Sequence, residues 1–126
     1  MTAPISFAAR TIRGDGRGKG LGVPTINLIL EDCPAELQEG IYACRVTYDD
    51  AIHVPASMHY GPRPVFGAEP SCEIHLLDRA PSHTPDTLDI SVIGRIRDVK
   101  DFPSVEALMA EIAEDNRTAR AMLGLS

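Results

Sequence analysis

The segment RGDGRGKGLGVPTIN near the N-terminus carries residue types that suit phosphate and metal binding. Its glycines alternate from Gly14 to Gly22, with Arg17 and Lys19 between them. Glycine lets backbone N–H groups approach phosphate oxygens closely, and a lysine adds positive charge. The pattern is neither the GxxxxGKS/T of a P-loop nor the GxGxxG of a dinucleotide fold. The glycines alone therefore leave two alternatives, a plain surface loop and a phosphate-binding loop.

Two oxygen-bearing side chains follow this segment directly. Thr25 and Asn27 are two residues apart, so both side chains lie on the same side of an extended strand. Hydroxyl and amide oxygens are hard ligands, and Mg²⁺ typically takes one or two protein oxygens together with waters and substrate phosphates. One interpretation is a metal–nucleotide site. The other is that both side chains bond the backbone of a turn, as Thr and Asn commonly do.

A carboxylate lies in the strand-like run CEIHLL, residues 72–77. Strict alternation puts Glu73 and His75 on one face of this strand and the apolar residues between them on the other. A carboxylate suits general-base catalysis, although a lone Glu on a strand is also commonly solvent-facing. His75 is the alternative base. His59 and His83 are interpreted as surface residues in loops.

The elements that must position these residues are mostly strands. Four runs rich in Ile, Val, Tyr and Thr and bounded by turn residues predict strands. They cover residues 41–48, 52–58, 72–77 and 88–97. Asp49 and Asp50 predict a tight hairpin turn between the first two strands. The prolines of GPRPVF, residues 61–66, predict a stiff loop.

One helix is predicted, near the C-terminus. Ser104 follows a proline and is a suitable N-cap, and Gly124 is a suitable end. Apolar residues recur at helical spacing over 105–113, with Glu111 and Asp115 expected on the opposite face. Several strands followed by a terminal helix are typical of a small β-barrel covered by a helix.

The composition is that of one ordinary domain over residues 1–126, with 44% hydrophobic and 24% charged residues. A net charge of −6 argues against nucleic-acid binding. No apolar run approaches the roughly 18 residues of a membrane span, and no signal-peptide core is present. Three cysteines without CxxC spacing predict a reducing cytoplasm rather than a zinc site or disulfides. We expect a monomer, because no sustained heptad pattern demands a partner.

Several ordered motifs resemble the ATP-dependent riboflavin kinase family. GDGRGKGLGVPTIN is similar to its glycine-rich stretch leading into Pro-Thr-Ala-Asn, EGIYACRV to its Gly-Val/Ile-Tyr strand, and GPRPVF to its Gly-x-Arg-Pro-Thr-Phe loop. CEIHLLD resembles the strand with the catalytic glutamate, and residues 96–120 resemble its Arg-containing flap and closing helix. The likeness extends from about Arg13 to about Leu123. The sequence departs from the family at His59-Tyr60, in place of Asn-Ile, and at Val65, in place of Thr.

The resemblance implies both a fold and a reaction. The implied fold is mainly β, a six-stranded antiparallel Greek-key β-barrel with a C-terminal α-helix. The implied reaction transfers the γ-phosphate of MgATP to the ribityl 5′-hydroxyl of riboflavin, giving FMN and ADP. Two alternatives remain, a catalytically impaired flavin- or nucleotide-binding module on the same barrel and a small barrel that only binds a protein. The chain is either a free-standing kinase or the kinase domain of a bifunctional FAD synthetase.

The resemblance also implies residue roles. Glu73 would be the general base that takes the proton of the flavin hydroxyl, and we expect it to point into the barrel mouth. Thr25 and Asn27 would hold Mg²⁺ beside the nucleotide. The other implied contacts are Gly14 and Lys19 at the ATP phosphates, Asp78 on the nucleotide side, and Arg97 in a loop that closes over the flavin.

Overall fold

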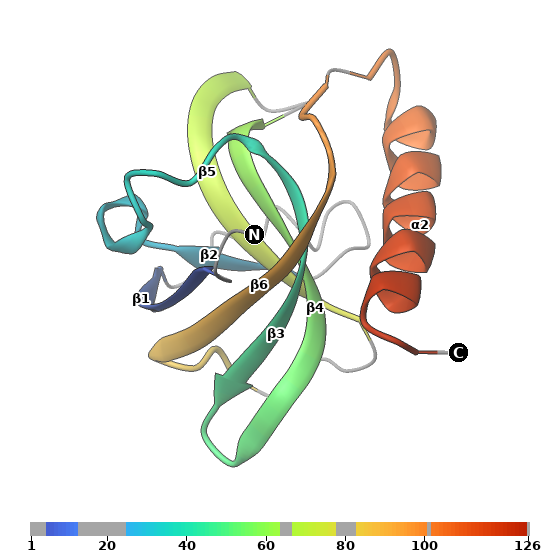
Figure 1. Ribbon diagram of the computed structural model, residues 1–126. Coiled ribbons are helices and arrows are strands. Elements are labelled where there is room, and N and C mark those ends of the chain that lie inside the picture. Colours follow the sequence, from blue (N-terminus) through green and yellow to red (C-terminus); the bar gives the residue numbers. More distant parts are fainter. Residues whose placement is uncertain (1–4, 13–24, 64–66, 78–82, 101, 126) are drawn as a thin grey trace.

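A computed structural model of the chain describes residues 5–12, 25–63, 67–77, 83–100 and 102–125 (Figure 1). The elements in chain order are β1 (Ile5–Ile12), β2 (Ile26–Leu28), the short 3-10 helix η1 (Leu30–Asp32), β3 (Gly40–Tyr48), β4 (Ala51–Arg63), β5 (Gly67–Leu76), β6 (Thr87–Arg97) and α2 (Val105–Met122). The six strands are antiparallel and close into a barrel in the order β1-β2-β5-β4-β3-β6. Strands β3, β4 and β5 follow one another as neighbours, and β6 returns beside β3, which is a Greek key. The predicted fold is confirmed.

The barrel interior is filled by apolar side chains from alternating strand positions. The largest of those that are fully buried are Leu28, Met58, Ile74, Leu88 and Ile90. In β5 the core takes Cys72, Ile74 and Leu76, which confirms the predicted alternation. Because successive side chains of a strand point to opposite faces, Glu73 lies on the outer face of the barrel wall.

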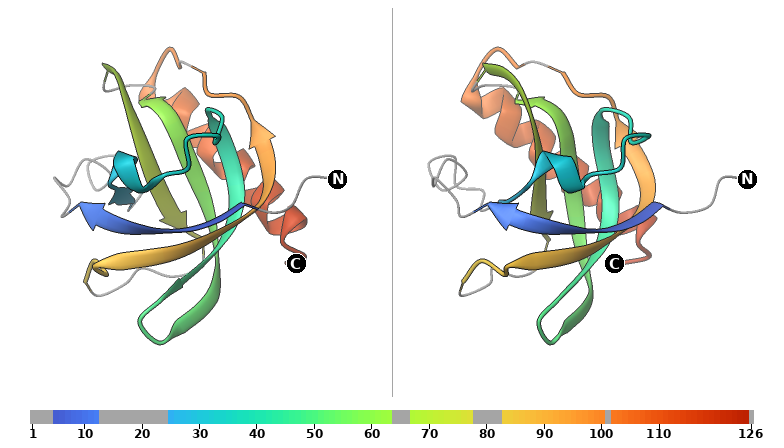
Figure 2. Two further views of the ribbon diagram at one scale, coloured as in Figure 1. Left: turned by 60° about the vertical axis from the view of Figure 1, so that its left-hand side comes forward. Right: turned by 90° about the vertical axis from the view of Figure 1, so that its left-hand side faces the viewer.

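Helix α2 packs on the outside of the barrel, against β3, β4 and β6 (Figure 2). Its contact with the wall is a second small apolar cluster around Ala43, Ala119 and Leu123. The Ser104 hydroxyl accepts a hydrogen bond from the Ala107 N–H, so the predicted N-cap is confirmed. At the other end, Arg45 Nη2 donates to the Leu123 carbonyl oxygen at 2.8 Å, which satisfies one of the last helix carbonyls.

The face that α2 buries agrees with the predicted one only in part, since Leu108 is buried as expected. Asp115, expected on the solvent face, is only 6% exposed, whereas Val105, expected on the apolar face, is 42% exposed. Asp115 is buried because it binds Arg97 on the barrel, and small Ala119 allows close approach to Ala43. The N-cap Ser104 and the terminal Gly124 predicted the extent of the helix, whereas the burial of Asp115 depends on its ion pair with Arg97.

The first half of the predicted GPRPVF loop, residues 61–63, belongs to a strand, and residues 64–66 lie outside the described residues. Strand β4 continues to Arg63 and β5 begins at Gly67, with Gly61 opposite Ser71. Gly61 has a φ of +139°, a conformation that favours glycine, and a Cβ there would lie 3.1 Å from Val99 Cγ2. The glycine therefore continues the ladder through a kink that other residues would strain.

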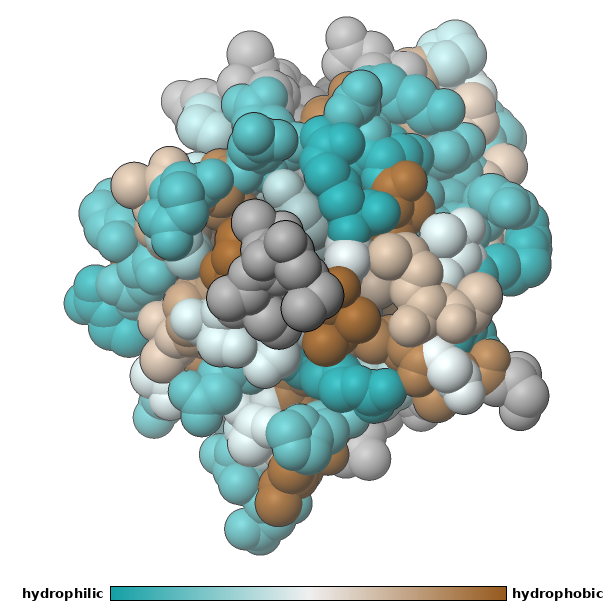
Figure 3. All heavy atoms as spheres, in the orientation of Figure 1, coloured by the Kyte–Doolittle hydropathy of each residue, from teal (hydrophilic) through white to brown (hydrophobic). Residues whose placement is uncertain are grey.

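The surface seen in Figure 3 mixes hydrophilic and apolar residues, and the apolar ones gather from the centre toward the lower right of the view. Within the described part of the chain, no helix is long and apolar enough to cross a membrane.

Candidate active site on the outer wall of the barrel

The pairing of β2 with β5 brings together three of the predicted site residues. Asn27 lies directly opposite Glu73 in this antiparallel ladder. Directly opposed residues have Cβ atoms roughly 5 Å apart. Thr25, just before β2, donates a hydrogen bond from Oγ1 to Glu73 Oε1 at 3.4 Å. The fold thus joins residues 25–27 to a carboxylate that lies about 50 residues further along the sequence.

The Asn27 side chain carries an unused acceptor. Its Oδ1 atom is buried and has no hydrogen-bond partner among the described residues. Ile26 and Leu28 on either side enter the barrel core, so Asn27 lies on the outer face. A buried polar atom without a partner is costly, and such atoms often mark a ligand site. A neutral amide oxygen beside the Thr25 hydroxyl fits the hard-oxygen ligands that Mg²⁺ prefers.

Glu73 is held in place by neighbours rather than freely solvated. Its side chain is 22% exposed. Ser71, two residues earlier on the same face of β5, donates a hydrogen bond from Oγ to Glu73 Oε2 at 2.9 Å. The carboxylate lies on the outer face of the wall, unlike the expectation that it points into the barrel mouth, because Cys72 and Ile74 occupy the interior side of β5. Its side chain is nevertheless partly covered and keeps part of its surface accessible, so a bound hydroxyl could come within hydrogen-bond reach.

His59 was expected at the surface of a loop, and the structure corrects this interpretation. It lies in β4 directly opposite Glu73, its side chain is 17% exposed, and its Nδ1 is 3.9 Å from Glu73 Oε2. Strand β4 extends further than predicted, which carries His59 into the sheet. His83 is exposed as expected, with Nε2 3.4 Å from Asp49 Oδ2.

Ser71 and His59 are the two site residues that sequence reasoning missed. Ser71 had a usable signal, because it shares the face of Glu73 at a spacing of two. His59 had none in the linear sequence, since its place opposite Glu73 depends on the register of β4 against β5. His75 is half-buried on the outer face of β5 and pairs with Ser57 of β4.

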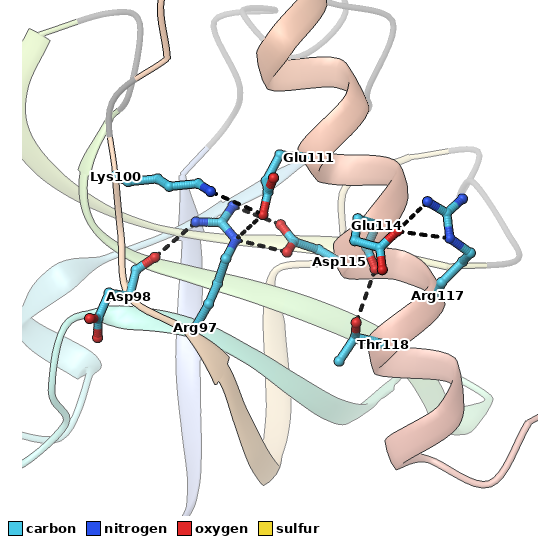
Figure 4. Close-up of polar contacts among 8 residues, drawn as sticks. All are labelled: Arg97, Asp98, Lys100, Glu111, Glu114, Asp115, Arg117 and Thr118. Atoms are coloured by element: carbon cyan, nitrogen blue, oxygen red, sulfur yellow. Dashed lines mark hydrogen bonds and ion pairs between the residues drawn. The ribbon is translucent and has the colours of Figure 1, made fainter.

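Arg97 ends β6, and its guanidinium is bound to α2 (Figure 4). It contacts Asp115 at 2.8 Å through both Nε and Nη2, and Glu111 Oε1 at 3.3 Å. Arg97 pairs with Ile41, which in turn pairs with His59, so Arg97 is two strands away from His59. Two strand spacings are roughly 10 Å. The structure thus does not bring Arg97 to Glu73, and its flavin contact stays a prediction.

The remaining predicted contacts, Gly14, Lys19 and Asp78, lie outside the described residues.

On the interior side of the wall, a hydrogen bond with Cys72 lowers the pKa of the Cys33 thiol. The same hydrogen bond, and then burial, raise the pKa of Cys72. Burial also raises the pKa of Tyr60, which pairs with Cys72. The wall behind Glu73 is therefore neutral near pH 7 at these two positions, Cys72 and Tyr60.

The chain matches known proteins over nearly its whole length. A family model described as riboflavin kinase matches residues 1–123. The bifunctional riboflavin kinase/FMN adenylyltransferase of Escherichia coli (strain K12) is 32% identical over 124 residues, covering 98% of this chain and 39% of that protein. The riboflavin kinase of Homo sapiens is 29% identical over 134 residues, covering 97% of this chain and 83% of that protein. The chain therefore spans about two fifths of the bifunctional relatives.

A solved structure also shares the fold. A crystal structure described as a macrolide-efflux protein from Streptococcus pneumoniae superposes with a TM-score of 0.79 at 28% sequence identity. The superposed region covers 94% of this chain and 39% of the chain in that crystal structure. The family match spans the strands of the barrel, the candidate site on its outer wall and helix α2. The chain belongs to the riboflavin kinase family.

Proposed function

We propose that this chain is a riboflavin kinase that transfers the γ-phosphate of MgATP to the 5′-hydroxyl of riboflavin, giving FMN and ADP. The observation that carries the proposal is the contact of Thr25 Oγ1 with Glu73 Oε1 at 3.4 Å, beside the partnerless Asn27 Oδ1. Phosphoryl transfer needs mostly positioning and charge stabilisation, with one carboxylate to orient or deprotonate the attacking hydroxyl. Two neutral oxygens next to one carboxylate meet that need.

Glu73 is the proposed general base. It takes the proton of the ribityl 5′-hydroxyl as that oxygen bonds to the γ-phosphorus and the bond from phosphorus to the ADP oxygen breaks. The hydrogen bonds from Ser71 and Thr25 hold the carboxylate in one orientation. Because both donors are short side chains on or beside strands, little motion is needed before proton transfer.

Thr25 and Asn27 are the proposed ligands of Mg²⁺. The buried Asn27 Oδ1 supports this assignment, because a cation would give that oxygen the partner it lacks. When bound, the ion neutralises charge on the phosphates. The Thr25 hydroxyl donates a hydrogen bond to Glu73, which leaves its oxygen lone pairs free for a ligand.

The further contacts are proposed from the family resemblance. Gly14 and Lys19 are assigned to the ATP phosphates, Asp78 to the nucleotide and Arg97 to the flavin. The proposed partners are riboflavin/FMN and ATP/ADP, without nucleic acid or membrane. We propose that residues 1–126 form one domain, monomeric and cytoplasmic. The free thiols of Cys33, Cys44 and Cys72 support a reducing compartment.

The test is direct product formation. The full chain is incubated with riboflavin and MgATP, and the flavins are separated by HPLC with fluorescence detection. We expect FMN and ADP in equal amounts, and no FMN without protein or with excess EDTA. Flavin binding without FMN formation would instead identify an impaired binding module on the same barrel.

A further inference from the structure

The geometry points to His59 as a positioning residue that holds the Glu73 carboxylate for proton transfer, a role that rests on the proposed kinase function. His59 Nδ1 lies 3.9 Å from Glu73 Oε2. Ser71 Oγ donates to the same Oε2 at 2.9 Å. Two groups from two strands thus face one carboxylate oxygen, and Ser71 bonds it directly. The other oxygen, Oε1, accepts the hydrogen bond of Thr25, one of the two proposed metal ligands, and is the oxygen that receives the substrate proton.

The sheet sets this arrangement rigidly. Glu73 has Asn27 of β2 on one side and His59 of β4 on the other, all in one row of the ladder. Side chains carried by strands are positioned more precisely than those on loops. The pairing of β4 with β5 therefore brings the carboxylate and the imidazole together, and the pairing of β2 with β5 holds the other side of Glu73.

The contact acts electrostatically. At 3.9 Å it is longer than a hydrogen bond, so an N–H at Nδ1 directs its dipole at Oε2 rather than bonding it fully. Both side chains are mostly covered, at 17% and 22% exposed for His59 and Glu73. Partial removal from water strengthens the interaction relative to one on the open surface. It disfavours rotation of Oε2 away from β4 and so keeps Oε1 toward the substrate.

The ring nitrogen of His59 that faces Glu73 is Nδ1, and this makes the proposal testable. Nδ1 is bonded directly to Cγ, and the amide nitrogen of an asparagine occupies nearly the same place. The longer glutamine places its amide where the ring has Nε2. His59→Asn therefore keeps an N–H beside Oε2, whereas His59→Gln and His59→Leu remove it. His83→Leu, at an exposed histidine outside the site, is the matched control.

The experiment measures steady-state FMN formation by the full chain with riboflavin and MgATP. We expect His59→Leu and His59→Gln to lower kcat about tenfold with KM values almost unchanged, because a misplaced catalytic group costs rate rather than binding. His59→Asn should recover most of the lost kcat, and His83→Leu should match the wild type. In a Glu73→Gln background, His59→Leu should cause no further loss, since it acts through Glu73.

Four results would overturn the role: wild-type kcat in both His59→Leu and His59→Gln, an equal loss in His59→Asn, a loss confined to KM, or a full loss in the Glu73→Gln background. Thermal unfolding verifies that each variant is folded. If His59→Leu does not fold, the comparison of kcat between His59→Asn and His59→Gln decides whether His59 positions Glu73. A wild-type chain that forms no FMN overturns the proposed function and the role together, whereas an active wild type with equally active variants overturns the role alone.

Discussion

Arg97 at the end of β6 and Asp115 in α2 form a two-pronged ion pair, with Nε–Oδ1 and Nη2–Oδ2 distances of 2.8 Å each. The Asp115 side chain is only 8% exposed, and Arg97 also lies 5.7 Å from the centre of the Phe102 ring. Bidentate arginine–carboxylate pairs fix orientation as well as distance. This pair therefore sets how α2 lies on the barrel wall.

Asp115→Asn should destabilise the chain by about 2–3 kcal/mol. Removing one partner of a mostly buried pair leaves a charge without compensation, which typically costs about 3–5 kcal/mol. The expected loss is smaller here because Glu111 remains 3.3 Å from Arg97. Urea unfolding followed by circular dichroism measures the change in the free energy of unfolding.

The same helix offers a matched control. Glu114 and Arg117 also form an ion pair, but their side chains are 59% and 67% exposed. Glu114→Gln should change stability by less than about 0.5 kcal/mol, because exposed pairs contribute little. Equal losses in Glu114→Gln and Asp115→Asn would show that burial of the Arg97 pair is not what matters.

The carboxyl group of Asp32 should have an unusually low pKa. Hydrogen bonds from the Arg10 side chain, and then from its backbone N–H, lower the pKa of Asp32 to about 2. Because the folded pKa is below the unfolded one, this contact stabilises the fold above about pH 4. That contribution is lost as the pH falls through about 2.

NMR titration of the Asp32 carboxyl carbon measures this pKa directly. In Arg10→Gln the midpoint should return toward about 4. The stability advantage of the wild type over Arg10→Gln should shrink between pH 4 and pH 2. A midpoint near 4 in the wild type would contradict the contact.

The three thiols should differ in reactivity. The hydrogen bond with Cys72 lowers the pKa of the half-buried Cys33, whereas burial raises the pKa of Cys44 to about 12. Since the thiolate is the reactive form, iodoacetamide at pH 7.5 should label Cys33 first in the folded chain. Peptide mass spectrometry locates the label. Labelling of Cys44 at the same rate would mean that the barrel opens faster than the reagent reacts.

Local sequence patterns predicted the turn and the start of the helix, because neighbouring residues decide those features. Asp49 and Asp50 connect β3 and β4 as predicted, and Asp49 adopts a φ of +47° that aspartate tolerates better than most residues. The helix begins after Ser104 because its hydroxyl caps the first turn. Strand β1 was missed, although Ile5, Phe7 and Ala9 alternate toward the core. The exposed positions of β1 include an alanine, so the alternation of apolar and polar residues that marks a strand is weak there.

Local sequence patterns could not predict the contacts between segments that are distant in the chain. The burial of Asp115 depends on Arg97, which is 18 residues earlier in the chain. The approach of His59 to Glu73 depends on the register of two long strands. By contrast, the family resemblance gave Thr25 and Glu73 roles in one reaction, which periodicity could not do, and the fold brings the two side chains into contact.

Asn27→Ala should separate activity from stability. The variant removes a buried oxygen that has no hydrogen-bond partner among the described residues, so thermal stability should stay the same or rise slightly. It also removes a proposed Mg²⁺ ligand, so kcat/KM for MgATP should fall on the order of 100-fold. Unchanged turnover in Asn27→Ala would refute the metal assignment, and a large loss of stability would show that the oxygen has a structural partner.

The most direct test of the whole account is the turnover number of Glu73→Gln. The substitution is nearly isosteric and keeps an acceptor for Ser71, but it removes the base. We predict a kcat lower by about 10²–10⁴-fold, with riboflavin and MgATP affinities almost unchanged, because general-base assistance acts in the transition state. A Glu73→Gln chain that forms FMN at the wild-type kcat would contradict the account.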